Sequence, residues 1–192
     1  MAKILENLYK ALGAGVVLAL VVFFLVHRSI DTAFVSFFFR WLHVLSGILW
    51  IGLLWYFNFV QIPTMPKIPA ELKPAVGKFI APEALFWFRW AALATVVTGL
   101  ILSILNGYGH QAFALQEGAR TIGIGMYLGL FMAANVWFVI WPNQKKALGI
   151  VPVDDAAKAK AARFAMLASR TNFVLSIPML YCMVAQQNGG AW

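Results

Sequence analysis

Residues 121–141 read TIGIGMYLGLFMAANVWFVIW and contain no charged side chain. A helix rises about 1.5 Å per residue, so a helix of this length crosses the roughly 30 Å hydrocarbon core of a bilayer. Stretches dominated by apolar residues also occupy residues 11–26, 33–62, 84–105 and 164–184. The sequence therefore predicts an all-α, polytopic membrane helix bundle of about five transmembrane helices.

The composition supports this prediction, because 62% hydrophobic and 11% charged residues are far from the values of soluble globular domains. The 192 residues suffice for five spans and short connections, so we expect one transmembrane domain over residues 1–192. Pro63, Pro66 and Pro69 are expected to end the second span. The Lys- and Ala-rich segment 153–163 is expected to form a short helix at the membrane interface.

The formal net charge is +8, yet the basic residues lie in short segments between the apolar runs. This distribution indicates membrane topology and predicts no nucleic-acid partner. One side of the predicted bundle collects ten basic residues: Lys3, Lys10, Lys67, Lys73, Lys78, Lys145, Lys146, Lys158, Lys160 and Arg163. Because basic residues favour the cytoplasmic side, we expect a cytoplasmic N-terminus and an external C-terminus.

The small and sulfur-containing residues set further limits. Cys182 is the single cysteine, so we expect neither a c-type haem nor an iron–sulfur cluster. Gly123, Gly125, Gly129 and Ala133 lie in the fourth span, where small side chains would let another helix approach closely.

Histidines form an outer layer of ionisable residues, with His27, His43 and His110 predicted on one side. His43 is the deepest, and Gly47 follows it by about one turn on the same helix face. Neutral imidazole is a common haem-iron ligand, so His43 is the candidate metal ligand for a haem b, with Gly47 leaving room for the ring system. Arg40 could contact a haem propionate. The alternative for His43 is a hydrogen bond to a carbonyl of a neighbouring helix.

A second polar layer is predicted toward the cytoplasm, formed by Asn58, Arg89, Asn135, Arg170 and Asn172. Guanidinium groups without a carboxylate in the same span need other oxygen partners, such as a quinone carbonyl, a haem propionate or a lipid phosphate. Arg89, Arg170 and Asn172 are therefore candidate cofactor contacts. The alternative is that both arginines extend to lipid headgroups while the asparagines connect helices.

Three runs carry a resemblance to a known family: RWLHVLSGILWIG at residues 40–52, WFVIWPNQ at 137–144 and RTNFVLSIPMLYCM at 170–183. Together they resemble the membrane domain of the urate oxidase N-terminal family from about residue 38 to residue 186. The resemblance implies a helical membrane protein. In larger members this domain precedes a c-type cytochrome and is associated with oxidation of urate to 5-hydroxyisourate. This chain lacks a CxxCH motif, and it has Gln186 and Gln187 where relatives tend to carry histidine.

These features favour a membrane redox subunit that binds haem b or a quinone between its helices. As an enzyme, the chain would be an oxidoreductase component, and the resemblance does not imply urate hydroxylation by this chain alone. Two alternatives are a cofactor-free accessory subunit of a larger respiratory or oxidase complex and a small-molecule or metal transporter. We expect a multi-pass protein of the bacterial cytoplasmic (inner) membrane, in contact with lipid and with other membrane subunits or further copies of itself.

Overall fold

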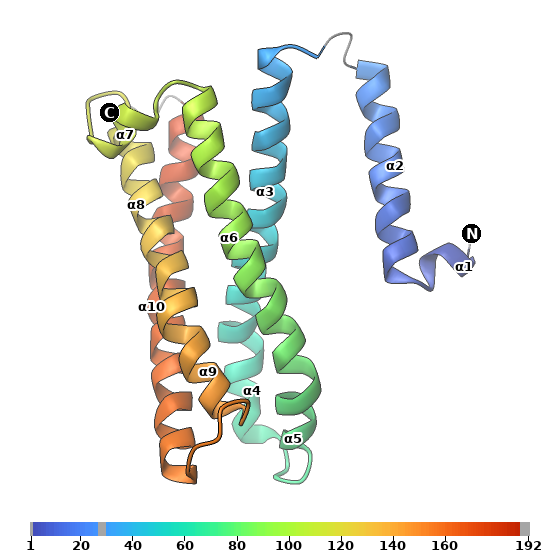
Figure 1. The fold of residues 1–192 in the computed structure, drawn as a ribbon, viewed down its shortest axis with the longest axis vertical. Helices are drawn as coiled ribbons and strands as arrows, with labels where there is room; N and C mark the ends of the chain where they lie inside the picture. Colours follow the sequence, from blue (N-terminus) through green and yellow to red (C-terminus); the bar gives the residue numbers. More distant parts are fainter. Residues whose placement is uncertain (1, 27–29, 189–192) are drawn as a thin grey trace. The chain divides into compact units, whose positions relative to one another are not determined.

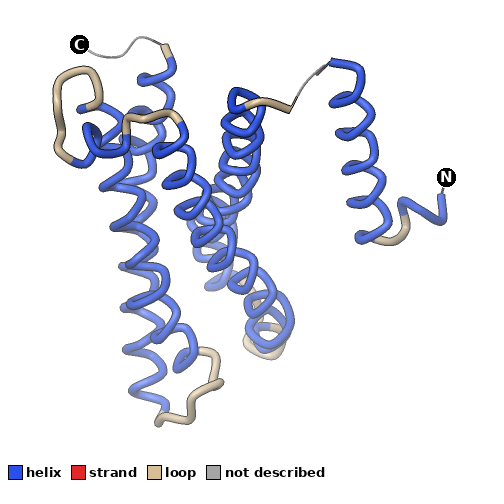
Figure 2. Tube along the Cα trace, turned by 45° about the horizontal axis from the view of Figure 1, so that its top comes forward, coloured by secondary structure: helices blue, strands red, loops and turns tan. Residues whose placement is uncertain are grey.

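The computed structural model describes residues 2–26 and 30–188, and all regular secondary structure in these two ranges is helical (Figure 1). Short loops connect the helices (Figure 2). The long α-helices are α2 (Leu8–Val26), α3 (Thr32–Tyr56), α6 (Ala81–Leu105), α8 (Arg120–Asn135) and α10 (Asp155–Gln187). The short ones are α1 (Ala2–Leu5), α4 (Ile62–Thr64), α5 (Lys73–Ala75), α7 (Gly109–Phe113) and α9 (Trp141–Ala147).

Several of these helices join into longer runs. Within residues 2–26 and 30–188, five runs are long and apolar enough to cross a membrane: Leu8–Val26, Thr32–Lys67, Lys73–Leu105, Arg120–Ala147 and Asp155–Gln187. They coincide with the five predicted spans, so the prediction of five candidate transmembrane helices is confirmed. The runs are longer than the apolar stretches because polar and basic residues extend the helices at their ends.

Three π-helical turns interrupt these runs, and each is followed two residues later by a proline. A proline ring clashes with the carbonyl four residues earlier and offers no N–H, so the preceding turn widens. The backbone N–H groups just after the turns then donate five residues back, from Ile62 to Phe57, Ala81 to Val76 and Trp141 to Val136. The turns are η1 (Phe57–Gln61) before Pro63, η3 (Val76–Ile80) before Pro82 and η4 (Val136–Ile140) before Pro142.

Two sequence predictions about helix ends were wrong. Pro63 and Pro66 do not end the second span, because the helix widens into a π turn before Pro63 and tightens into a 3₁₀ turn at Pro66, so that the run continues past both rings. That run continues through α4 and the 3₁₀ turn η2 (Met65–Lys67). Segment 153–163 forms no separate helix, because α10 runs unbroken from Asp155. Asp154 caps α10 by accepting a 2.7 Å hydrogen bond from the backbone N–H of Ala157.

The chain divides into two compact units, Met1–Phe38 and Phe39–Trp192. In the first unit, α2 is apolar from Ala11 onward and has no buried residue. Its Phe23 ring packs against Phe34, with the ring centroids 4.9 Å apart. A largely apolar helix with no buried residue is suited to contact with lipid or another chain.

In the second unit, the later part of α3 packs with α6, α8 and α10 around a core of large apolar side chains. Helices α8 and α10 lie side by side (Figure 1), and Gly125 is what allows this. A Cβ atom on Gly125 would lie 2.9 Å from the Cβ of Cys182, which is too close. The predicted use of small residues in the fourth span for close helix packing is therefore confirmed at this glycine. The largest fully buried apolar side chains of the core are Trp50, Leu54, Phe88, Met132 and Val136.

Candidate functional site

His43 lies on α3 and is held against α6. Its Nδ1 atom is 2.8 Å from the carbonyl oxygen of Thr95. A carbonyl only accepts hydrogen bonds, so Nδ1 carries the proton in the neutral ring and Nε2 keeps its lone pair. Among the described residues, no side chain or backbone group forms a hydrogen bond with Nε2. The imidazole is thus fixed in orientation and tautomer while one nitrogen stays available.

Two glycines shape this contact. A Cβ atom on Gly99 of α6 would lie 2.8 Å from the Cε1 atom of His43, so only glycine admits the ring at this position. Gly47 of α3 faces the same helix, because its Cβ atom would lie 3.9 Å from the Cγ2 atom of Thr95. The two helices therefore approach closely on either side of the imidazole.

The remaining predicted members of the outer layer do not join His43. Arg40 is exposed on α3, and His110 is exposed on α7. His27 lies outside the described residues. Arg40 acts instead on Tyr108: burial raises the pKa of the Tyr108 hydroxyl, and the positive charge of Arg40 partly offsets that rise. The outer site consists of His43, the Thr95 carbonyl to which it is bonded, and the two glycines that let α3 and α6 approach each other.

Arg89 of α6 is buried, and it contacts its own helix and the aromatic ring of Trp141. Its Nη1 atom donates a 3.0 Å hydrogen bond to the carbonyl of Leu85, one turn earlier. The guanidinium carbon lies 3.4 Å from the centre of the Trp141 ring, so the charge rests on an aromatic face. In the described part of the chain Arg89 has no carboxylate partner, since the salt bridge found there joins Lys158 to Asp155.

Three asparagines connect α10 to its neighbours. Asn172 is fully buried and uses both atoms of its amide, donating to the carbonyl of Met132 at 2.9 Å and accepting from Asn135 at 2.7 Å. Asn58 donates to the Ser169 hydroxyl at 3.1 Å. Each of these bonds joins two different helical runs, so the amides act as links between helices.

Arg170 is separated from this layer. It is exposed on the outer side of α10, although Asn172 lies only two residues further on. Two helical residues so spaced point about 200° apart, which places them on opposite faces. The structure therefore does not bring Arg170 together with Arg89 or Asn172.

Sequence reasoning did not single out a cavity of about 110 Å³ in the second unit. Helical runs from four parts of the chain meet around it, and the π turns η1 and η4 each contribute to its wall. Most of the lining is apolar, but Gln61, Gln144 and Ser169 also contribute. Pro63 and Pro142 could have indicated the cavity in the sequence, because each lies two residues after a π turn that contributes to the cavity wall. In the described ranges there is no group of three or more His, Cys, Asp and Glu side chains that could hold a metal ion.

Comparison with known proteins relates one part of the chain to a known family. The model of the urate oxidase N-terminal family matches 84 consecutive residues, from 108 to 191. Residues 108–191 resemble the urate oxidase N-terminal family. The expected resemblance is confirmed over this region, which contains two of the three runs quoted above and helices α7, α8, α9 and α10.

The match to the urate oxidase N-terminal family does not reach α3 and α6, so it includes Asn172 and Arg170 but not His43 or Arg89. No curated protein and no solved structure matches the chain significantly. The family relation therefore rests on the helices from α7 onward, and any role for His43 rests on the geometry of α3 and α6.

Proposed function

We propose that the chain is a membrane redox subunit in which His43 binds the iron of a b-type haem through Nε2. The observation that supports this is the hydrogen bond from Nδ1 to the carbonyl of Thr95, which leaves Nε2 unpaired among the described residues. Metal-ligating histidines usually donate their other N–H to a carbonyl or carboxylate, which fixes the ring and makes it a better ligand.

The surroundings of His43 fit a haem at the surface of the α3–α6 pair. The cavity of about 110 Å³ is much too small for a porphyrin. It also lies away from His43, since its wall residue Gln61 follows about 27 Å further along the helix at 1.5 Å per residue. His43 itself is half-buried, and we propose that a haem would lie on the side of the ring that faces lipid or a second subunit. Arg40, about one turn before His43, is exposed and could pair with a propionate there.

The bound haem would supply one-electron transfer, and the protein would set its position and electronics. His43 is the single histidine of the described second unit that is neither exposed nor at a helix end. We infer that His43 would be the residue of this chain that holds the haem iron.

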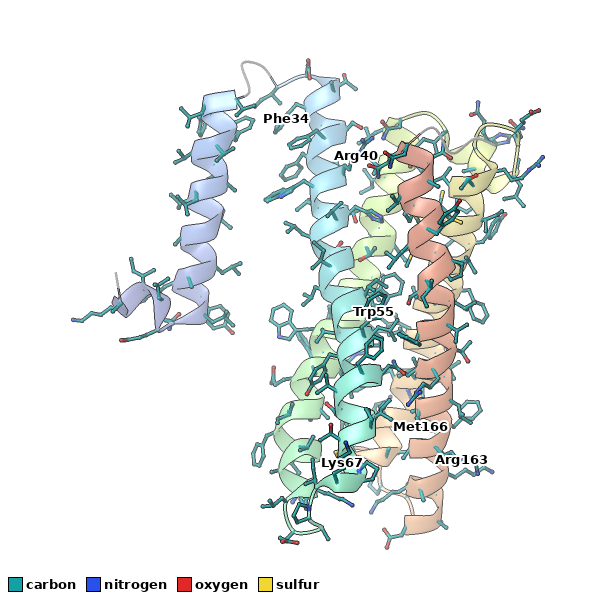
Figure 3. The ribbon with its side chains drawn as sticks, turned by 180° about the vertical axis from the view of Figure 1, so that it is seen from behind. Phe34, Arg40, Trp55, Lys67, Arg163 and Met166 are labelled. Carbon is teal, nitrogen blue, oxygen red and sulfur yellow. The ribbon has the colours of Figure 1, made fainter. Side chains whose placement is uncertain are left out.

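We also propose a topology and a location. Lys67 and Arg163, from different helical runs, lie at the same end of the second unit (Figure 3). Basic residues gathered at one end favour a cytoplasmic placement of that end, hence a cytoplasmic N-terminus and an external C-terminus. The bacterial cytoplasmic membrane is the proposed location, and a relation to the membrane domain of urate-hydroxylating enzymes is proposed for the matched region.

A second candidate is a cofactor-free accessory subunit of a larger respiratory or oxidase complex. The observation that favours it is the use of the inner amides as helix links together with the uncovered apolar surface of α2. Such a protein would be rigid, would carry no chromophore and would bind its partners through lipid-facing helices.

Absorption spectroscopy of the protein purified in mild detergent separates the two candidates. The redox subunit should show a Soret band, reduced b-type peaks after dithionite and about one haem per chain in a pyridine haemochrome assay. A well-folded but colourless protein that co-purifies with other membrane subunits would reject the haem proposal and support the accessory role.

A further inference from the structure

The guanidinium group of Arg89 has one edge that the protein does not use. Its central carbon lies 3.4 Å from the centre of the Trp141 ring, and its Nη1 atom donates to the carbonyl of Leu85 at 3.0 Å. These two contacts fix the position of the group. The Nε and Nη2 atoms form no hydrogen bond with any described residue, and neither atom is fully enclosed by the protein. Both atoms therefore keep N–H groups for another molecule.

The free edge of Arg89 matches an oxyanion. Arginine presents its N–H groups in a rigid planar fork that pairs with two oxygens of a carboxylate or a phosphate. No carboxylate of the chain fills this fork within residues 2–26 and 30–188, where Glu83, the acidic residue nearest in the sequence, is exposed and forms no ion pair. Arg89 is only 9% exposed, so its charge has little access to water. A charge so placed in a membrane-spanning run favours an anionic ligand.

A second cation lies near the same aromatic ring. The Nζ atom of Lys145, on α9, is 5.7 Å from the centre of the Trp141 ring. Lys145 is half-buried and forms no ion pair in the part of the chain that the structure describes. The two positive charges are therefore neighbours, although Arg89 and Lys145 belong to different helical runs. Like charges repel each other, and an anion bound at Arg89 would offset that repulsion.

The surroundings of Arg89 indicate the depth of lipid headgroups. Trp87 and Trp90 lie on either side of Arg89 in the sequence, and both are exposed. Exposed tryptophans of membrane helices concentrate where the hydrocarbon core meets the headgroups. Lys145 lies in the last turn of α9, which Figure 1 shows at the same end of the second unit as α4 and α5. Basic groups between helices at this depth typically bind acidic lipid headgroups.

We propose that Arg89 binds the phosphate group of an anionic membrane phospholipid. The Nε and Nη2 atoms donate to two phosphate oxygens, and Lys145 attracts the net negative charge of the headgroup. A zwitterionic lipid carries the same phosphate together with a cationic group, which Lys145 repels, so the site selects anionic lipids. A free phosphate ion has the same oxygens but lacks the acyl chains that bring a lipid to this depth. The site does not depend on haem at His43, because neither Arg89 nor Lys145 contacts that residue.

The test is native mass spectrometry of the detergent-purified full chain, titrated with dioctanoyl phosphatidylglycerol, dioctanoyl phosphatidylcholine or inorganic phosphate. Phosphatidylglycerol should bind about tenfold more tightly than phosphatidylcholine, because its headgroup carries no cation. R89Q should bind phosphatidylglycerol about tenfold more weakly, because it removes the charged fork. R163Q is the matched control: it alters an exposed arginine of α10, so it should bind the lipid like the unaltered protein.

A second variant keeps the proposal testable if R89Q folds poorly. K145Q changes a half-buried side chain and should weaken phosphatidylglycerol binding about fivefold, whereas K146Q, at the exposed neighbouring position, should change it little. Inorganic phosphate should not displace the lipid. Equal affinity for both lipids, equal losses in R89Q and R163Q, or unchanged binding in K145Q would overturn the proposal. Binding of inorganic phosphate as tight as that of phosphatidylglycerol would assign the site to a free phosphate ion and reject the lipid.

Discussion

Two helix contacts in the second unit each contain a glycine and a polar side chain, but the polar side chains differ in how many of their nitrogen and oxygen atoms form hydrogen bonds. Between α8 and α10, Gly125 allows close approach and Asn172 spends both atoms of its amide on bonds to the neighbouring helix. Between α3 and α6, Gly99 allows close approach and His43 spends only one of its two nitrogens. The first contact is complete in itself, whereas the second leaves a lone pair for another molecule. We infer that the first contact serves stability and the second serves binding.

The largest effect is expected at Gly125, in the contact between α8 and α10. G125L should destabilise the protein by about 3 kcal/mol or prevent folding, because the added side chain would overlap Cys182 across the helix contact. Thermal unfolding followed by tryptophan fluorescence measures this. G129A is the matched control: a Cβ there would meet no atom within 4 Å, so stability should stay equal or rise. Equal melting temperatures for G125L and the unaltered protein would mean that α8 and α10 are not in close contact.

The next largest effect is expected at Asn172, whose amide connects α10 to α8. N172A should lower the unfolding free energy by about 2 kcal/mol, because it removes two buried hydrogen bonds, the one to the Met132 carbonyl and the one from Asn135. Denaturant unfolding in detergent measures the change, and haem content should be unaffected. If N172A removed the haem signal while leaving stability intact, the division between the two contacts would be wrong.

Gly99, in the contact between α3 and α6, should respond differently from Gly125. G99A should cost only about 1 kcal/mol of stability, because a surface-near ring can move aside, but it should disturb haem binding strongly. The reason is that a displaced imidazole loses its bond to Thr95 and with it the orientation of Nε2. Haem per chain after purification is the readout. Normal haem content with a displaced His43 would show that the support from α6 is unimportant.

The smallest effect is expected at Arg170. R170Q should change stability by no more than about 0.5 kcal/mol and leave haem binding intact, because the side chain is exposed and lies on another helix than His43. The same unfolding and binding assays measure it. A loss of haem in R170Q would place this guanidinium in a site that the structure does not assign to it.

Much of the fold follows from the sequence because hydropathy alone marks membrane-crossing helices. The unbroken start of α10 was missed because its lysines were taken to mark the interface, although the Ala- and Lys-rich segment has high helix propensity and nothing to break it. The π turn before Pro63 was not predicted, because Pro63 was expected to end the span, and no prediction was made for the turns before Pro82 and Pro142. In each case the proline lies two residues beyond a widened turn, a pattern visible in the sequence once the clash with the preceding carbonyl is considered.

The sites were less predictable, for physical reasons that differ between residues. His43 could be found because an ionisable group within an apolar run is rare. Its partners could not, since Thr95 acts through a backbone carbonyl and Gly99 through the lack of a side chain. Arg170 and Asn172 were grouped by depth alone, but their spacing of two residues already places them on opposite faces of a helix. Gln61 carries no charge and passed unnoticed in its long apolar run.

The central claim, that Nε2 of His43 binds haem iron, is tested most directly by replacing the ligand and then supplying it again. H43G should be purified without haem and should regain a b-type spectrum when haem and free imidazole are added together, whereas haem alone should restore little. H110G, which alters an exposed histidine, should keep its haem throughout. Full haem content in H43G without imidazole, or loss of haem in H110G alone, would contradict the account.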